Sequence, residues 1–182
     1  MMSAVTFELL SPNDYPLICE WRNSPQVRQW YYDYDNPHRV YTTEYIRAYH
    51  ERKATENPRL GQYTIVLDGV KAGFVQCYSV SDYPDYNSHI QVDDTTAAVD
   101  IFLAPSFMHK GYGSRIMRTF LDEIVFSSVH FFADKCLIGP EPTNTAAIKM
   151  YRKAGFSYRK TVQISGEQEP EYIMLLHRDE LT

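Results

Sequence analysis

The stretch that decides the fold is Val99–Ile124, which reads VDIFLAPSFMHKGYGSRIMRTFLDEI. It begins as a short apolar run closed by Pro105, which is typical of a buried strand. Its last part repeats apolar residues at helical spacing, which predicts a helix with one apolar face: Ile116, Met117, Phe120, Leu121 and Ile124. A loop with glycines and a lysine joins the two. Free N–H groups and the positive end of the helix dipole would converge on this loop, so the stretch predicts an anion-binding site.

The whole chain has the composition of a globular protein. Its 182 residues predict a single domain over residues 1–182. The net charge of −5 argues against nucleic acid as a partner. No apolar run approaches the roughly 20 residues that span a membrane, and the first residues lack a signal-peptide pattern, so we expect a cytoplasmic protein with no membrane partner. Three widely spaced cysteines predict neither a disulfide framework nor a metal site.

Charge is distributed unevenly along the chain. Residues 72–109 contain no lysine or arginine, but they contain Asp82, Asp85, Asp93, Asp94 and Asp100. Basic residues return from Lys110 onward. We interpret the two regions as separate sites for a cation and an anion; chance clustering on solvated loops is the alternative.

Periodicity and turn signals predict a mixed α/β chain whose sheet is largely antiparallel. Strands are expected at 5–10, 62–67, 70–80, 99–105, 132–138, 157–164 and 171–176. Helices are expected from Ser11 and from Ser24, at about 43–55, over 116–124 and at 145–154. Residues 81–92 are polar and are expected to form a long loop or a bent strand extension.

An aromatic run, Trp30–Pro37, interleaves four aromatic rings with Asp33 and Asp35. Such rings beside carboxylates suit the recognition of a polar, cationic ligand by stacking, cation–π contact and ion pairing. The alternative is that Trp30 and Tyr31 plug an edge of the core. The sequence does not decide between the two.

Together with this element order, two motifs resemble those of the GNAT superfamily of acyl-CoA-dependent N-acyltransferases. The first is the pyrophosphate loop Met108–Gly113, with Met108 where the family usually has Gln or Arg. The second is the helix Asn144–Phe156, which reads NTAAIKMYRKAGF. The resemblance implies one domain of class α/β (α+β), with a mixed, mostly antiparallel sheet of about seven strands and helices on both faces. It also implies acetyl-CoA as cofactor.

Within the superfamily the chain most resembles the aminoglycoside 6′-N-acetyltransferases. The residues that carry this likeness are Asp100, the segment Glu20–Asn23 followed by Trp30, and the acidic middle of the chain. Gly139 departs from the pattern, because those enzymes tend to carry Asp before the equivalent of Pro140. The resemblance implies acetyl transfer to a primary amine of a cationic small molecule. The alternatives are a siderophore precursor, a metabolite amine or a protein N-terminus as acceptor, and a non-catalytic acyl-CoA-binding module.

The implied reaction needs a group that accepts the amine's proton and a group that protonates the leaving thiolate. Asp100, on an apolar strand, is the candidate for the first role, and a structural carboxylate is the alternative. The resemblance places Tyr151 near the thioester sulfur, where its phenol could serve as the acid. Packing in the core is the alternative for Tyr151.

The remaining site residues follow from the resemblance and from residue type. Backbone groups of Ile101, Phe102 and Leu103 are expected to pair with the pantetheine arm. The pyrophosphate is expected on the loop formed by His109, Lys110, Gly111, Tyr112, Gly113 and Ser114. Asn144 would donate to pantetheine or cap its helix. Candidates for acceptor binding are Trp30, Tyr31, Asp33, Asp82, Asp94 and Glu141. No metal is expected, and the chain is expected to be a monomer or a homodimer.

Overall fold

The computed structural model describes residues 4–33, 35–36, 38–128 and 132–181. Its seven strands are β1 (Val5–Leu9), β2 (Gly61–Leu67), β3 (Val70–Ser79), β4 (Thr96–Leu103), β5 (Lys135–Ile138), β6 (Ser157–Val162) and β7 (Glu171–His177). They form one sheet in the order β1-β2-β3-β4-β5-β7-β6. The pairs β1–β2, β5–β7 and β6–β7 are antiparallel, whereas β4–β5 is parallel. The predicted class, an α/β fold with a mixed, mostly antiparallel seven-stranded sheet, is confirmed.

The chain divides into two compact units. The first comprises Met1–Gln76 and Ile101–Lys110, and the second comprises Cys77–Asp100 and Gly111–Thr182. The boundaries fall inside β3 and β4, so each of these strands passes from one unit to the other. That residues 1–182 act as a single domain stays a prediction.

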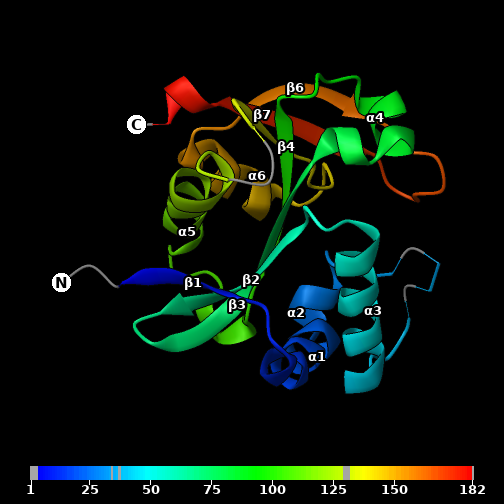
Figure 1. Ribbon diagram of the computed structural model, residues 1–182, viewed down its shortest axis with the longest axis vertical. Coiled ribbons are helices and arrows are strands. Elements are labelled where there is room, and N and C mark those ends of the chain that lie inside the picture. The colour runs from blue at the N-terminus through cyan, green and yellow to red at the C-terminus, as the bar shows by residue number, and fades with distance from the viewer. Residues whose placement is uncertain (1–3, 34, 37, 129–131, 182) are drawn as a thin grey trace. The chain divides into compact units, whose positions relative to one another are not determined.

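The first unit contains the 3-10 helices η1 (Pro12–Asp14) and η3 (Pro105–Phe107) and the helices α1 (Tyr15–Asn23), α2 (Pro25–Arg28) and α3 (Thr43–Glu56), of which α1–α3 lie together in Figure 1. The predicted helix starts are confirmed, since Ser24 accepts a hydrogen bond from the N–H of Val27 and Thr42 from that of Tyr45. The core of this unit is aromatic: Phe74 and Phe102 are buried, and their ring centroids are 5.6 Å apart. The core therefore lies where α1 and α3 meet strands β3 and β4.

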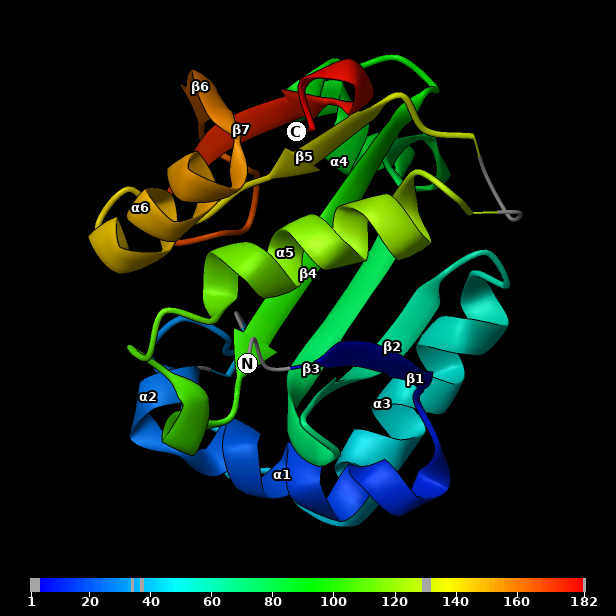
Figure 2. The same cartoon turned by 90° about the vertical axis from the view of Figure 1, so that its left-hand side faces the viewer.

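The second unit contains η2 (Val80–Asp82), α4 (Pro84–Ile90), α5 (Gly113–Phe120), the π-helical turn η4 (Leu121–Val125), α6 (Thr145–Ala154) and η5 (Arg178–Glu180). Figure 2 shows α6 beside β5, β6 and β7. The predicted bounds of α6 are confirmed, because Asn144 caps its start by accepting from the N–H of Ala147 at 3.1 Å. Gly155 ends it in the left-handed conformation that glycine adopts at low cost, with φ 112°.

The expectation of a loop or strand extension over 81–92 is wrong, because η2 and α4 occupy most of it. Pro84 supplies a helical φ at the start of α4, and Gln91 closes its end in the left-handed conformation. The helix was hard to predict because only Ile90 of α4 is buried, so the segment has no apolar repeat.

Two other expectations need smaller corrections. The predicted 116–124 helix is α-helical only to Phe120 and continues as a π-helical turn. The strand expected from 132 begins at Lys135. In the aromatic run, Tyr34 and Pro37 lie outside the described residues.

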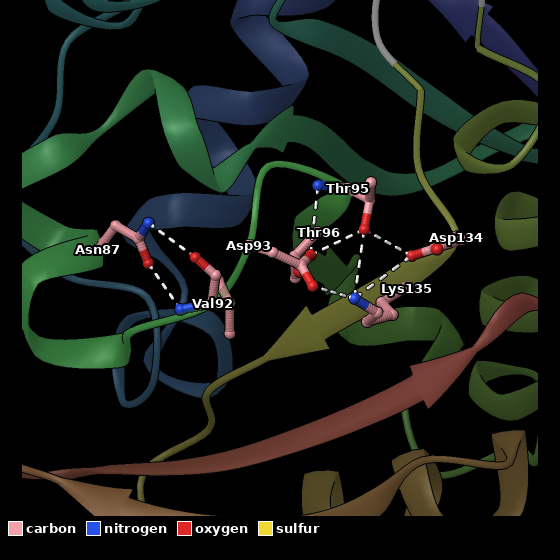
Figure 3. A network of polar contacts seen from close by, with 7 residues as sticks. All are labelled: Asn87, Val92, Asp93, Thr95, Thr96, Asp134 and Lys135. Atoms are coloured by element: carbon pink, nitrogen blue, oxygen red, sulfur yellow. Dashed lines mark hydrogen bonds and ion pairs between the residues drawn. The ribbon is translucent and has the colours of Figure 1, made fainter.

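A polar network fixes the start of β4 against the start of β5 (Figure 3). Asp93 Oδ1 accepts hydrogen bonds from the hydroxyls of Thr95 at 2.7 Å and Thr96 at 3.0 Å. Lys135 forms ion pairs with Asp93 and Asp134. These contacts set the parallel register in which Thr96 pairs with Lys135. Asp93, one of the aspartates between residues 72 and 109, therefore has a structural role.

Within the described part of the chain, no helix is long and apolar enough to cross a membrane.

Candidate active site

Asp100 is half-buried in the second unit, on β4 beyond the segment that pairs with β5. The parallel pairing of β4 with β5 runs from Thr96 and Lys135 to Ala98 and Leu137. Asp100 thus lies two residues past the last pair, near the point where β5 ends at Ile138. The fold places this carboxylate at the carboxyl-terminal end of the paired segment.

Tyr151 is buried on the inner side of α6 and is electrostatically coupled to Asp100. Its ring packs at a steep angle to that of Phe156, with centroids 6.0 Å apart. Burial raises the pKa of the phenol well above 10, and the negative charge of Asp100 raises it further. Both effects favour the protonated form. The structure therefore places the two residues expected to act in proton transfer in the same unit, and it keeps the phenol of Tyr151 protonated.

Three further residues of this unit join Asp100 and Tyr151. The hydroxyl of Tyr86 on α4 donates to Glu171 Oε2 at 2.7 Å, and Tyr78 lies within the electrostatic influence of Asp100, Tyr86 and Glu171. We call these five residues the carboxylate–tyrosine cluster: Tyr78, Tyr86, Asp100, Tyr151 and Glu171.

Glu171 is the acidic member that the sequence did not reveal. Burial raises its pKa to about 8; the hydrogen bond from Tyr86 opposes this shift, and the charges of Glu167 and Asp100 add to it. The groups that shift this pKa are a tyrosine, Tyr86, and two acidic residues, Glu167 and Asp100. The cluster is therefore acidic and favours a cation. The only sequence signal was the excess of carboxylates, which does not say which of them meet.

The predicted anion loop, Met108–Ser114, contains two residues in the left-handed conformation, His109 with φ 58° and Gly111 with φ 84°. Helical hydrogen bonding in α5 begins where the N–H of Ile116 donates to the carbonyl of Tyr112 at 3.0 Å. The N–H groups of Gly113 and Ser114 precede that bond, as an anion site at a helix start requires. His109 and Lys110 belong to the first unit, and Gly111 to Ser114 belong to the second.

The two glycines of this loop are required for different structural reasons. A side-chain carbon added at Gly111 would meet nothing within 4 Å, so open space lies beside this position. One added at Gly113 would lie 2.9 Å from Cγ of Met150. Gly113 therefore permits the close packing of α5 against α6, while Gly111 serves the turn.

The three candidates from the aromatic run, Trp30, Tyr31 and Asp33, lie in the first unit. Two of them have structural partners there. The rings of Tyr31 and Phe102 meet edge to face at 4.9 Å. The carboxylate of Asp33 forms an ion pair with Arg39 at 2.8 Å and accepts from the hydroxyl of Tyr45 at 3.2 Å. Trp30 remains 36% exposed. Core packing thus accounts for Tyr31, and Asp33 already has a cation.

The other predicted residues are dispersed. Ile101, Phe102 and Leu103 continue β4 after Asp100 and lie in the first unit, where the side chain of Phe102 is buried in the core. Asp82 ends η2, and Asp94 lies before the start of β4, in the turn held by Asp93.

Two predicted residues belong to the turn that precedes α6. The carbonyl of Glu141 accepts from the N–H of Asn144 at 3.0 Å. The side chain of Asn144 caps α6, so one of its two expected roles is observed. Among the described residues, no group of three or more His, Cys, Asp or Glu side chains could hold a metal ion.

Comparison with known proteins places this geometry in a family. Residues 11–164 match the acetyltransferase (GNAT) domain. A protein of Klebsiella pneumoniae named aminoglycoside N(6′)-acetyltransferase type 1 is 26% identical over 160 residues, which cover 87% of this chain and 77% of the relative.

Solved structures show the same fold. Aminoglycoside acetyltransferase AAC(6′)-Ib, in complex with coenzyme A and kanamycin, superposes with a TM-score of 0.81 at 24% identity, over 97% of this chain and 96% of that one. Spermidine N-acetyltransferase from Vibrio cholerae, in complex with coenzyme A and spermine, gives 0.72 at 15% identity over 97% of each chain. Because the family match covers most of its length, the chain belongs to the acetyltransferase (GNAT) domain family.

Proposed function

We propose that this acetyltransferase transfers an acetyl group from acetyl-CoA to the 6′-amine of an aminoglycoside. The observation that carries the proposal is the coupling of Asp100 to the buried phenol of Tyr151 within one acidic cluster. The coupling provides a carboxylate for a cationic amine and a protonated acid in the same unit.

The acceptor arrives as an ammonium ion, because an alkylamine is mostly protonated at neutral pH. Asp100 attracts the ammonium and takes its proton, directly or through water. The freed nitrogen attacks the thioester carbon, forming the C–N bond of the amide. When the C–S bond breaks, Tyr151 donates its proton to the departing sulfur, and the proton held at Asp100 passes to solvent or back to the phenolate. Atoms and charge balance without a covalent enzyme intermediate.

The residues of the anion loop fit coenzyme A. Gly111 leaves open space beside a backbone that only glycine adopts at low cost, and the N–H groups of Gly113 and Ser114 precede the first helical bond of α5. We expect these groups to hold the pyrophosphate. We also expect the backbone of Ile101 to Leu103, which follows Asp100 on β4, to pair with the pantetheine arm.

The choice of an aminoglycoside rests on two supports. The carboxylate–tyrosine cluster contains two acidic side chains, Asp100 and Glu171, which suits a cationic acceptor. The relative from Klebsiella pneumoniae is named as an aminoglycoside N(6′)-acetyltransferase, and the match covers 87% of this chain. Acetylation of this kind would protect a cell from the antibiotic, and we place the enzyme in the cytoplasm, where acetyl-CoA is made.

Thiol release with acetyl-CoA tests the proposal. Kanamycin A, which has a 6′-amine, should be turned over, whereas paromomycin, with a hydroxyl at that position, should not give a 6′-N-acetyl product. Spermidine should be a poor acceptor by comparison. Turnover of spermidine but of no aminoglycoside would replace the proposed acceptor by a polyamine, and binding of acetyl-CoA with no acceptor in a broad amine screen would indicate a non-catalytic module.

A further inference from the structure

Arg22 is a buried cation in the last turn of helix α1. It is only 4% exposed, and its Nη2 donates to the hydroxyl of Tyr41 at 2.8 Å. Its guanidinium carbon lies 4.0 Å from the ring centroid of Tyr41, 5.1 Å from that of Tyr31 and 5.6 Å from that of Tyr49. We call these three rings the tyrosine cage. Arg22 thus contacts three aromatic rings, an environment that suits its planar, weakly hydrated group.

Stability of the fold does not account for an arginine at this position. Its Nε and Nη1 are buried and have no hydrogen-bond partner among the described residues. Burying a charge with unpaired donors costs free energy, and an apolar side chain of similar volume is often as stable in such a place, or more so. Residues that cost stability in this way are typical of functional sites. The cage is therefore a place to look for function.

The cage joins parts of the chain that are separate in sequence. Tyr31 follows α2, Tyr41 precedes α3 and Tyr49 lies within α3, and the three helices lie together in Figure 1. The side chain of Asn23, the neighbour of Arg22, holds the backbone of Tyr41 at both groups. Its Oδ1 accepts from the N–H of Tyr41, and its Nδ2 donates to the carbonyl, each at 2.9 Å. The last turn of α1 therefore fixes the backbone before α3 and contacts the ring after α2.

The ring of Tyr31 connects the cage to strand β4. It contacts the guanidinium of Arg22 at 5.1 Å and meets the ring of Phe102 edge to face at 4.9 Å. Phe102 lies in the stretch 101–103 that we expect to pair with the pantetheine arm, and all these residues belong to the first unit. Trp30, the residue before Tyr31, is 36% exposed. The position of Tyr31 therefore constrains the backbone from which the exposed ring of Trp30 extends.

We propose that Arg22 is a positioning residue for acceptor binding, which fixes Tyr31 against Phe102 and so holds Trp30 as an aromatic wall for the acceptor. The inference rests on the proposed function and adds a residue that acts through Tyr31 without touching the substrate. An indole face suits the sugar rings and ammonium groups of an aminoglycoside, through apolar and cation–π contact.

Variants of the full-length protein separate positioning from stability. Arg22→Met removes the charge and keeps an unbranched side chain that can fill the space. We expect it to raise KM for kanamycin A by roughly 10- to 30-fold, the factor that corresponds to one buried cation–π contact, with kcat and KM for acetyl-CoA within about twofold of the wild type. Its free energy of unfolding should equal or exceed that of the wild type, because the buried charge is gone.

Two further variants complete the series. Arg22→Lys keeps the charge without the planar group, so its KM for kanamycin A should lie between those of the wild type and Arg22→Met. Arg47→Met is the matched control, because Arg47 is an exposed arginine of α3, and its kinetics should equal those of the wild type.

A double-variant cycle tests the route through Tyr31. Tyr31→Leu should raise KM for kanamycin A as Arg22→Met does, and the double variant should be no worse than either single one, because both changes release the same ring. Tryptophan fluorescence gives a second readout. Kanamycin A should change the emission of Trp30 in the wild type, a signal that Trp30→Phe lacks, and Arg22→Met should need roughly 10- to 30-fold more kanamycin A for the same change.

The possible results are distinguishable. Turnover of kanamycin A by the wild type, with a folded Arg22→Met variant that has the KM of the Arg47→Met control, would overturn this inference alone. A loss of stability in Arg22→Met, together with weaker binding of both substrates, would also overturn it, because that result assigns Arg22 a general structural role. A wild type that neither binds nor acetylates kanamycin A would overturn the proposed function and this inference together.

Discussion

The hydroxyl of Tyr86 and the carboxylate of Glu171 are 2.7 Å apart, so helix α4 is joined to the first residue of β7 across 85 positions of sequence. The contact holds the carboxyl group of Glu171 within the carboxylate–tyrosine cluster. Burial of the same carboxyl group makes the stability of the protein depend on pH.

Glu171 should make the unliganded protein less stable as pH rises. Its pKa is about 8 in the folded protein, against an ordinary value of 4.5, so the folded state binds the proton more tightly. The associated stability is fully present below about pH 4.5 and is lost as pH rises toward 8. Glu171→Gln lacks this titration, so its melting temperature relative to the wild type should increase over that range and level off above it. A difference that stays constant with pH would contradict the buried position of the carboxyl group.

Tyr151→Phe should reduce kcat by about 10²-fold, because it removes the proton donor and keeps the ring that packs on Phe156. The affinity for acetyl-CoA should change little. Steady-state kinetics and direct binding of acetyl-CoA separate the two effects. A folded variant with wild-type kcat would show that Tyr151 only packs in the core.

Asp100→Asn should lower kcat/KM for kanamycin A by more than about 10²-fold, because the amide neither attracts the ammonium nor takes its proton. Asp122→Asn is the matched control, since Asp122 is exposed in the π-helical turn η4. Kinetics of both variants with kanamycin A check this assignment. Equal losses in the two variants would point to a general effect of acidic charge.

Gly113→Ala should destabilise the protein through a contact with Met150, since the added carbon would lie 2.9 Å from Met150 Cγ. We expect a cost of about 1–3 kcal/mol, typical of overpacking. Adding Met150→Ala should recover part of this loss, whereas it should not rescue Gly111→Ala, whose cost of about 1 kcal/mol comes from backbone conformation. Urea unfolding of the single and double variants measures the coupling; additive losses would contradict this account of Gly113.

Asp93→Ala should lower the free energy of unfolding by about 1–2 kcal/mol, because Asp93 accepts hydrogen bonds from Thr95 and Thr96 in the turn before β4. The ion pair with Lys135 should add little, since the Asp93 side chain is 56% exposed. Acetyl transfer should be unaffected at low temperature. Urea unfolding together with a kinetic assay checks both expectations, and a loss of activity without a loss of stability would contradict the structural role.

Features with local causes could be predicted from the sequence. Helix α6 has a capping Asn144 and a terminal Gly155, and the loop before α5 needs glycine at a left-handed position. The apolar runs of the sequence also predicted most of the strands. These signals lie within a few residues of the structure that they specify.

The features that depend on distant contacts could not be predicted. Helix α4 is short, buries only Ile90 and is ended by Gln91, so no periodic pattern marks it. Glu171 joins the site only because β7 pairs with β5 and brings it over Gly139. The ion pair of Asp33 with Arg39 also comes from the fold, and the role of Asp33 in acceptor binding stays a prediction. In each case residue type was visible, but the partner depended on the fold.

Identification of the acetylated nitrogen tests the central claim most directly. The wild type should be incubated with acetyl-CoA and kanamycin A, and the product should be assigned by mass spectrometry and NMR, with Asp100→Asn as the control. We predict thiol release that matches the formation of 6′-N-acetylkanamycin and is nearly abolished in the variant. Acetylation at another nitrogen would contradict the assigned position, and a folded protein that binds acetyl-CoA but forms no acetylated aminoglycoside would contradict the proposed function itself.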